Sequence, residues 1–267
     1  MSGERVLVTG ASGFVGRHLL RELSAAGYLV RAALRRPLPE IAGVEQVIVG
    51  DLSGFVDWSA ALTGVRHVVH GAGLAHADTA LPEEAYRRAN TDATLALADA
   101  AQAAGVARFV FLSSIRAQSG PASDRPLSER DAPAPTDAYG RSKLAGEQAV
   151  AAAGDNHAIL RTAWVHSPYG GNFVKTMLRL AESREELGIV ADQLGTPTYA
   201  PALADAVIAI ARRLAADPRD AGLRGVFHIA GSGETSWAGL AEAVFAASAR
   251  LGGPSARVQP IATAEYP

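Results

Sequence analysis

A tyrosine and a lysine in the middle of the chain have the types and spacing needed to move a proton. Tyr139 and Lys143 lie in a segment that follows Pro135, where helical spacing would put both side chains on one face. Thr136 or Asp137 could cap this helix, which is expected to continue to Ala153. A phenol titrates near pH 10, so proton exchange near neutrality requires its pKa to fall by about 3. An ammonium group about 4 Å away would supply roughly that stabilisation. The pair indicates acid–base chemistry, with a chance surface pair as the alternative.

A serine pair could hold a carbonyl group beside that phenol. Ser113 and Ser114 follow the apolar run 109–112, which is typical of a buried strand. Ligands of open α/β sheets bind at the carboxyl ends of the strands, so the Ser114 hydroxyl would face a reacting oxygen. A turn-capping serine is the alternative, and the presence of Tyr139 favours catalysis. The candidate catalytic residues are Ser114, Tyr139 and Lys143.

Glycines near the N-terminus predict a phosphate-binding turn. Gly10, Gly13 and Gly16 follow the strand-like residues 6–9 and open an amphipathic segment. In such a pattern the first glycine allows a tight turn, the second leaves space for a pyrophosphate, and the third lets the helix approach the sheet. A glycine turn without a ligand is the alternative, but the flanking elements favour a dinucleotide. The candidate residues are Gly10, Ser12, Gly13, Phe14, Val15 and Gly16.

Residues after later strands predict which dinucleotide binds. Arg35 and Arg36 follow the strand expected at 30–34, and no acid directly follows it. At this position an acid accepts the ribose 2′-hydroxyl of NAD, whereas arginine accommodates the 2′-phosphate of NADP. NADP(H) is therefore favoured, and NAD(H) stays open because the arginines could simply face water. Further cofactor contacts are expected from Asp51, Leu52, Gly71, Ala72 and Gly73.

The elements that position these residues follow an alternating pattern. Short β-branched runs alternate with longer segments of helical period, which predicts parallel strands joined by helices. Strands are expected at 6–9, 30–34, 46–49, 67–70, 109–112, 157–160 and 226–229. The predicted fold is α/β, a doubly wound parallel Rossmann sheet with a small C-terminal substrate lobe. We expect an NAD(P)-binding domain at 1–163 with a returning segment at 199–230, and a substrate-binding lobe at 164–198 and 231–267.

Composition restricts the partners. The chain has 267 residues, 48% of them hydrophobic, which indicates a sizeable core. The absence of cysteine excludes thiolate metal sites. The net charge of -2 provides no overall positive field for binding nucleic acid. His67 and His70 would lie on opposite strand faces, so no metal is expected. Residues 1–5 lack the features of a signal peptide, and no apolar run spans a membrane. We expect a cytoplasmic protein with a small-molecule substrate; a homodimer stays open. The charges of Glu182, Glu185 and Glu186 predict a solvated helix.

Taken together, the motifs resemble extended short-chain dehydrogenase/reductases that act on nucleotide sugars. The glycine turn, Asp51-Leu52, Asn90, Ser113-Ser114 and the run Tyr139-Gly-Arg-Ser-Lys143 match that pattern in order. The resemblance implies that Ser114 and Tyr139 bind the substrate oxygen, that Tyr139 transfers the proton and that Lys143 holds the nicotinamide ribose. It also implies that Asn90 orders the backbone near the cofactor.

The two halves resemble different subfamilies. Up to Ala153 the chain is similar to UDP-sugar 4-epimerase-like proteins, and from Ile159 onward it resembles dTDP-4-dehydrorhamnose reductases. Those reductases carry Ser-Thr-Asp-Tyr-Val-Phe where this chain has Ser113-Ser114-Ile115-Arg116, and they continue past the point where this sequence ends. We therefore expect a recombinant or chimera joined between 153 and 159 and shortened at its end. The resemblance assigns a nucleotide-sugar pocket to Trp164, Asn172, Phe173, Lys175, Gln193 and Thr198.

Three functions follow from these observations. The favoured one is NADPH-dependent reduction of the 4-keto group of a nucleotide-activated 6-deoxysugar, as in dTDP-4-dehydrorhamnose reductases. The second is NAD-dependent UDP-sugar 4-epimerisation, in which the cofactor takes and returns a hydride. The third is a non-catalytic NADP-binding protein or an assembled chimera without native activity. Net consumption of the cofactor separates the first from the second.

Overall fold

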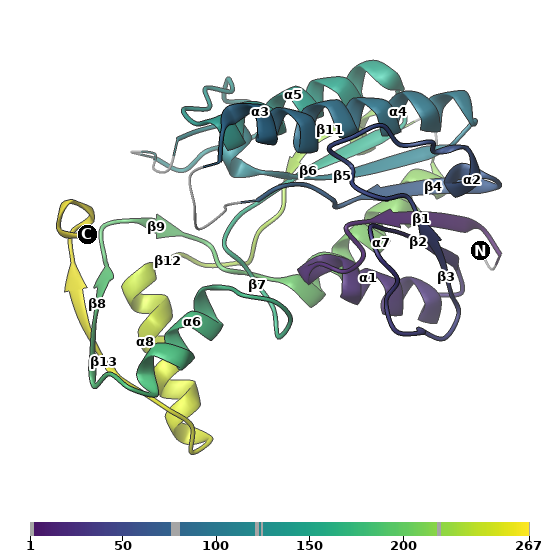
Figure 1. The fold of residues 1–267 in the computed structure, drawn as a ribbon. Coiled ribbons are helices and arrows are strands. Elements are labelled where there is room, and N and C mark those ends of the chain that lie inside the picture. Colours follow the sequence, from purple (N-terminus) through teal and green to yellow (C-terminus); the bar gives the residue numbers. More distant parts are fainter. Residues whose placement is uncertain (1–2, 76–80, 121–122, 124, 218–219, 267) are drawn as a thin grey trace. The chain divides into compact units, whose positions relative to one another are not determined.

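The chain divides into two compact units (Figure 1). The computed structural model describes residues 3–75, 81–120, 123, 125–217 and 220–266. One unit comprises Met1–Thr162 and Pro201–Ile229, and the other comprises Ala163–Ala200 and Ala230–Pro267. The first unit holds the large sheet, and the second holds three short two-stranded sheets with two helices among its described residues. Each unit therefore has its own core.

The large sheet has seven strands, and every neighbouring pair in it is parallel. Its order is β11-β6-β5-β4-β1-β2-β3, so the connections reverse direction between β1 and β4. The predicted doubly wound α/β fold is confirmed, and all seven predicted strands are present with ends shifted by one or two residues. The strands are β1 (Arg5–Thr9), β2 (Leu29–Leu34), β3 (Val44–Ile48), β4 (Val65–His70), β5 (Arg108–Ser114), β6 (His157–Thr162) and β11 (Gly225–His228).

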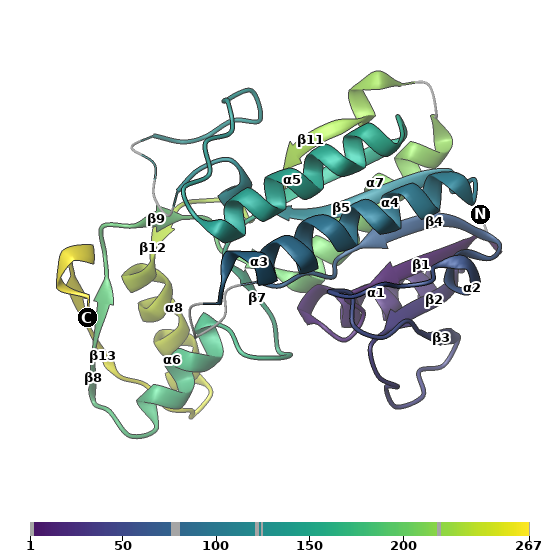
Figure 2. The same ribbon diagram turned by 45° about the horizontal axis from the view of Figure 1, so that its top comes forward.

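Helices cover both faces of this sheet. Figure 2 shows α3, α4 and α5 on one face, with α1 and α7 on the other. Strands sandwiched in this way need apolar side chains on both faces, which explains the continuous apolar runs. Leu7, Phe111 and Ile159 of the sheet are fully buried and belong to one core cluster with Leu97 of α4. The helices are α1 (Phe14–Ala25), α2 (Ser59–Leu62), α3 (Glu83–Tyr86), α4 (Ala93–Ala103), α5 (Ala138–Ala153) and α7 (Ala200–Ala216).

The helix that carries Tyr139 and Lys143 begins where the sequence predicts. Asp137 is the N-cap of α5, and its carboxylate accepts a hydrogen bond from the Gly140 N–H at 2.6 Å. An aspartate at this position satisfies one of the free N–H groups of the first turn, and its negative charge interacts favourably with the helix dipole. The helix then runs to Ala153, as expected.

The second unit packs two helices against a pair of strands. Met177 of α6 (Phe173–Ala181) and Phe245 of α8 (Trp237–Arg250) are buried with Leu187 of β8 (Glu186–Val190). β8 pairs in parallel with β13 (Arg257–Ile261). The predicted charged helix through Glu182–Glu186 is wrong: α6 ends at Ala181, and Glu186 already belongs to β8, where it forms an ion pair with Arg257. The remaining short strands are β7 (Val165–His166), β9 (Leu194–Gly195), β10 (Thr198–Tyr199) and β12 (Thr235–Ser236).

The described residues contain neither a membrane-spanning helix nor a metal-binding cluster. No helix there is both long and apolar enough to cross a membrane. No cluster of three or more His, Cys, Asp or Glu residues there could hold a metal ion.

Candidate active site

The glycine turn between β1 and α1 is closed by backbone contacts. Gly10 has a φ of 67°, and a Cβ on it would lie 2.5 Å from the carbonyl carbon of Gly71. A Cβ on Gly16 would lie 2.1 Å from the carbonyl oxygen of Gly10, so α1 rests directly on the turn. Gly13 is the N-cap of α1 and gives it no side-chain cap, which leaves the first N–H groups of a helix beside the end of β1. This arrangement fits a dinucleotide pyrophosphate.

The loop after β4 is fastened by two buried polar residues. The Ala72 N–H donates a hydrogen bond to Thr9 Oγ1 at 3.1 Å. Asn90, fully buried in the π-helical turn η1 (Arg87–Asp92), accepts a hydrogen bond from the Leu74 N–H at 2.7 Å and donates one to the Leu74 carbonyl at 2.9 Å. A Cβ on Gly73 would lie 2.8 Å from Asn90 Oδ1, so a larger residue here would displace the Asn90 amide. The loop 71–74, which is expected to contact the cofactor, is thus held in place by these hydrogen bonds.

His70 connects Thr9 with Asn90 through a series of hydrogen bonds in which each donor and acceptor is defined. The Thr94 hydroxyl donates to the Asn90 carbonyl at 2.7 Å, so it accepts from His70 Nε2 at 2.9 Å. His70 Nδ1 then accepts from the Thr9 hydroxyl at 2.6 Å. A neutral imidazole satisfies every partner in this chain. Complete burial, with a smaller contribution from Lys143, lowers the pKa of His70 from 6.5 to about 3.

Stability should fall as the pH drops through the window set by His70. The unfolded chain binds a proton on His70 below pH 6.5, whereas the folded chain binds it only near about pH 3. Since the folded-state pKa is the lower one, this group takes about 1.4 kcal/mol per pH unit from the free energy of unfolding across that window. Urea unfolding at a series of pH values should therefore give a shallower slope for His70→Asn than for wild type. Equal slopes would show that His70 is protonated in the folded protein.

Ser114 and Tyr139 meet at the end of β5. Their hydroxyl groups are hydrogen-bonded to each other, and Ser114 Oγ also accepts the Arg116 N–H at 3.2 Å. The Tyr139 ring packs edge-on against Tyr86, with ring centroids 6.2 Å apart. Burial raises the pKa of the Tyr139 phenol, and the Ser114 hydrogen bond and the Arg116 charge oppose that rise.

Lys143 points at the strand beside it. Its Nζ donates a hydrogen bond to the Leu112 carbonyl at 2.8 Å and lies 4.1 Å from the centroid of the Phe111 ring. Burial lowers the pKa of Lys143 to about 7, while the Glu147 carboxylate opposes that change. The sequence predicts that Lys143 lowers the pKa of the phenol. The structure differs, because the cation that lowers the pKa of Tyr139 is Arg116.

The residues expected to distinguish NADP from NAD lie on the surface. Arg35 Nη1 is 4.0 Å from Asp51 Oδ2, and both side chains are exposed. Asp51 also accepts hydrogen bonds from the Ser53 N–H and hydroxyl, which lower the pKa of its carboxyl. Arg36 is exposed as well. Two guanidinium groups are thus open to solvent directly after β2.

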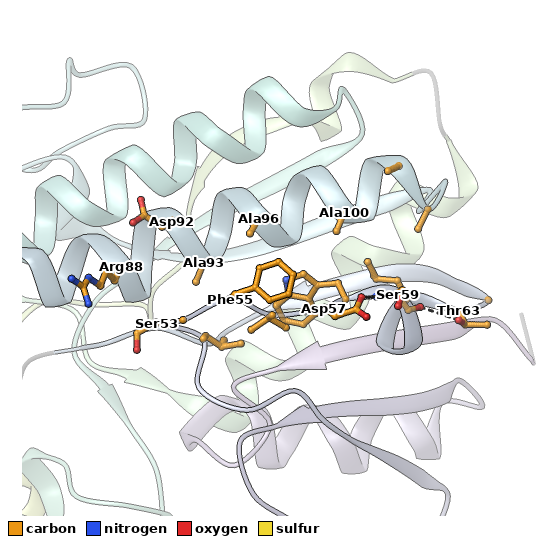
Figure 3. A pocket seen from close by; sticks show the side chains of 18 residues that line it. Ser53, Phe55, Asp57, Ser59, Thr63, Arg88, Asp92, Ala93, Ala96 and Ala100 are labelled. Atoms are coloured by element: carbon orange, nitrogen blue, oxygen red, sulfur yellow. Dashed lines mark hydrogen bonds between the residues drawn. The ribbon is translucent and has the colours of Figure 1, made fainter.

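A cavity of about 800 Å³ opens beside Leu52 in the first unit. Figure 3 shows Ala93, Ala96 and Ala100 of α4 facing the segment that carries Phe55 and Asp57. The cavity includes Leu52, which the sequence assigns to the cofactor. Ser114, Tyr139 and Lys143 do not line it.

Three of the six residues assigned to the substrate meet around one tryptophan of the second unit. Trp164 stacks on Trp237 with ring centroids 3.5 Å apart, and Phe173 lies 4.7 Å from the same ring. Gln193 Oε1 accepts a hydrogen bond from Trp237 Nε1 at 3.2 Å. Trp164 has a φ of 46°, the one positive value at a non-glycine residue among those described, and such strain is common at binding sites. Trp237 is not predicted from the sequence, because an isolated tryptophan there belongs to no motif.

The other three have local structural contacts. Asn172 caps α6 by accepting the Lys175 N–H at 3.3 Å, and it donates to the Ser167 carbonyl at 2.7 Å. Lys175 Nζ donates to the Pro168 carbonyl at 3.3 Å. Thr198 is buried and accepts the Gly231 N–H at 3.4 Å. Thr198 also adjoins the tryptophan cluster through its backbone, because its N–H donates to the Trp164 carbonyl at 3.1 Å.

A parallel sheet with a glycine turn beside its topological switch point defines a Rossmann-type dinucleotide-binding protein. Comparison with known proteins identifies the particular group. The profile of the RmlD substrate binding domain matches residues 4–267, and the chain belongs to this family. The match continues through 153–159, so the comparisons give no support to an epimerase-like N-terminal half or to a chimera.

Several similar proteins are named dTDP-4-dehydrorhamnose reductase, and a similar structure carries another name. The chain is 50% identical over 186 residues to a dTDP-4-dehydrorhamnose reductase of Sinorhizobium fredii, which covers 70% of this chain and 62% of that protein. It is 37% identical over 271 residues to the Burkholderia thailandensis reductase, with 98% and 86% covered. A crystal structure of the Bacillus anthracis reductase in complex with NADP is similar, with a TM-score of 0.81, 30% identity, and 99% and 86% coverage. MoeE5 in complex with UDP-glucuronic acid and NAD has a TM-score of 0.77, 30% identity, and 97% and 85% coverage.

Proposed function

We propose that the protein uses NADPH to reduce the 4-keto group of a nucleotide-activated 6-deoxysugar, as its relatives named dTDP-4-dehydrorhamnose reductase do. The observation that carries the proposal is the hydrogen-bonded pair of Ser114 and Tyr139 at the carboxyl end of β5, with buried Lys143 one turn further along α5. This is the edge of the sheet at which open α/β folds bind their ligands. The family membership of the whole chain and its likeness to an NADP complex support the same reading.

The chain's own groups supply the proton chemistry. NADPH, when bound, supplies the hydride that adds to the carbonyl carbon. Ser114 holds the carbonyl oxygen by a hydrogen bond, and the Tyr139 hydroxyl gives that oxygen its proton, so the ketone becomes an alcohol. Lys143 is the residue that would hold the nicotinamide ribose, and burial lowers the pKa of its ammonium group to about 7.

The two units divide the binding task in this proposal. The first unit holds the dinucleotide through the glycine turn and the fastened loop 71–74. The second holds the nucleotide sugar, with Trp164 and Phe173 as stacking faces and Lys175 as a cation for the diphosphate. The cytoplasmic location and the homodimer remain predictions from the sequence.

The exposed arginines after β2 should decide between the two dinucleotides. Arg35→Ala removes a guanidinium that would pair with a 2′-phosphate, so the Kd for NADPH should rise about tenfold while the Kd for NADH changes little. Fluorescence titration of both cofactors measures this. Arg21→Ala, which removes an exposed arginine on α1, is the matched control and should change neither constant. An equal loss for both cofactors would remove Arg35 from 2′-phosphate recognition.

UDP-sugar 4-epimerisation is the second candidate. Its supporting observation is the likeness to MoeE5 bound to UDP-glucuronic acid and NAD. Incubation of the protein with NADPH and dTDP-4-dehydrorhamnose, against a panel of other nucleotide ketosugars, separates the two functions. The proposed reductase consumes NADPH in proportion to ketone. A protein that retains NAD through purification and interconverts epimers without consuming NADPH is an epimerase.

A further inference from the structure

Arg116 is a largely buried cation next to the N-terminal end of α5, the helix that carries Tyr139. It lies in the turn η2 (Ile115–Ala117), directly after Ser114, where the sequence departs from the motif expected of dTDP-4-dehydrorhamnose reductases. Its side chain is 21% exposed and its guanidinium forms an ion pair with Asp137. Its Nε is buried and has no hydrogen-bond partner among the described residues. A charge kept from water in this way acts strongly on its neighbours.

Arg116 contacts two residues near Tyr139, namely Ser114 and Asp137. Its main-chain N–H donates to Ser114 Oγ, and that hydroxyl is hydrogen-bonded to the phenol. Its guanidinium holds Asp137, which caps α5 through Gly140 in the same turn as Tyr139. A Cβ on Gly140 would lie 2.2 Å from the Arg116 carbonyl oxygen, so the backbones of η2 and α5 are in direct contact. The backbone of Arg116 is therefore held against the helix that carries the phenol.

The other charged or titratable groups near this helix end act differently. Tyr86 of α3 packs on the Tyr139 ring and, if ionised, would oppose a phenolate. Lys143 donates to the Leu112 carbonyl on β5. On the exposed side, Arg141 is neutralised by Glu83. Of the described groups packed around Tyr139, Arg116 is the cation that favours the phenolate.

We propose that Arg116 is a positioning residue that stabilises the Tyr139 phenolate left when the proton has moved to the substrate oxygen, and that Asp137 limits this effect by pairing with Arg116. The role rests on the proposed function, because only proton transfer from Tyr139 creates that phenolate in the reaction. Asp137 therefore has two tasks, since it also caps the helix. Substitutions at the two positions should affect the phenol in opposite directions.

Three variants of the full chain test this assignment without cofactor or substrate. In Arg116→Gln the phenol loses its cation, so its titration midpoint should rise by about one pH unit, the lower end of what a neighbouring charge does. Arg116→Lys keeps the charge and should stay close to wild type. Asp137→Asn keeps a good helix cap but frees the Arg116 charge, so the midpoint should fall. NMR of tyrosine isotopically labelled at Cζ follows the titration, and Tyr139→Phe identifies the signal among the six tyrosines.

Kinetics give the second readout. The protonated phenol is the reactive form in the reduction, so kcat/KM should fall at high pH, at a higher pH in Arg116→Gln and a lower pH in Asp137→Asn. Midpoints that do not move, or that move in the same direction in both variants, would overturn the proposal, since general damage to the helix end acts in one direction. Opposite shifts in a protein that reduces no ketosugar would support the role of Arg116 and contradict the proposed function instead. Asp137→Asn keeps the test decisive if Arg116→Gln fails to fold.

Discussion

Tyr139→Phe should lower kcat for ketone reduction about a hundredfold to ten-thousandfold while leaving the Kd for NADPH within about twofold. The substitution removes one hydroxyl group and keeps the ring that packs against Tyr86. The Ser114 hydroxyl remains to hold the carbonyl oxygen, but it is a much weaker acid than a phenol. The measurement is single-turnover oxidation of NADPH at saturating ketosugar.

Tyr86→Phe is the matched control for this experiment. It removes a phenol hydroxyl from the buried neighbour whose ring lies 6.2 Å from that of Tyr139. Its kcat should stay near wild type, because that hydroxyl has no part in the proposed transfer. A Tyr139→Phe protein with the same kcat as Tyr86→Phe would remove Tyr139 as the proton donor.

Glu147→Ala should cost about 3–5 kcal/mol in free energy of unfolding, the usual result when one partner of a buried ion pair is removed. Glu147 on α5 and Arg161 on β6 are each only 3% exposed and are joined by bonds of 2.7 Å (Nη2 to Oε2) and 3.0 Å (Nε to Oε1). The Ser113 hydroxyl donates to the same carboxylate at 2.5 Å. Alanine would leave the Arg161 guanidinium buried without its ion-pair partner. Urea unfolding measures the loss.

Two comparisons show whether burial of the charge causes this cost. The double variant Glu147→Leu with Arg161→Met replaces the pair by apolar side chains and should recover most of the lost stability. Glu84→Ala removes a carboxylate from an exposed ion pair with Arg87 and should leave the free energy of unfolding close to wild type. If Glu147→Ala were no less stable than Glu84→Ala, water would have to reach Arg161 in the folded protein.

The parts of the fold that the sequence predicted are those encoded locally. Most strands of the sheet are rich in apolar or β-branched residues, and α5 is indicated by an N-cap acid and by the helical spacing of Tyr139 and Lys143. β8 was missed because its first residue, Glu186, continues a charged run that reads as helix. Its strand form depends on pairing with β13, whose residues lie about seventy positions away, and such pairings leave no local pattern.

The candidate site shows the same division. The types of Ser114 and Tyr139 were enough to predict that they act together, and the structure brings them into a hydrogen bond. The source of electrostatic control was not predictable, because the direction of the Lys143 side chain depends on the Leu112 carbonyl and the Phe111 ring of a strand far away in the chain. Arg116 departs from a motif in the sequence, but its ion pair with Asp137 depends on the packing of η2 against α5.

Transfer of an isotope tests the central claim most directly. NADPH carrying deuterium on the hydride-donating face of its nicotinamide ring is incubated with dTDP-4-dehydrorhamnose and the purified protein. The account predicts that one equivalent of cofactor is oxidised for each sugar reduced and that the deuterium is found on C4 of the sugar product. Product that forms without deuterium from the added cofactor, or without its oxidation, would contradict the assignment of this protein as an NADPH-dependent ketosugar reductase.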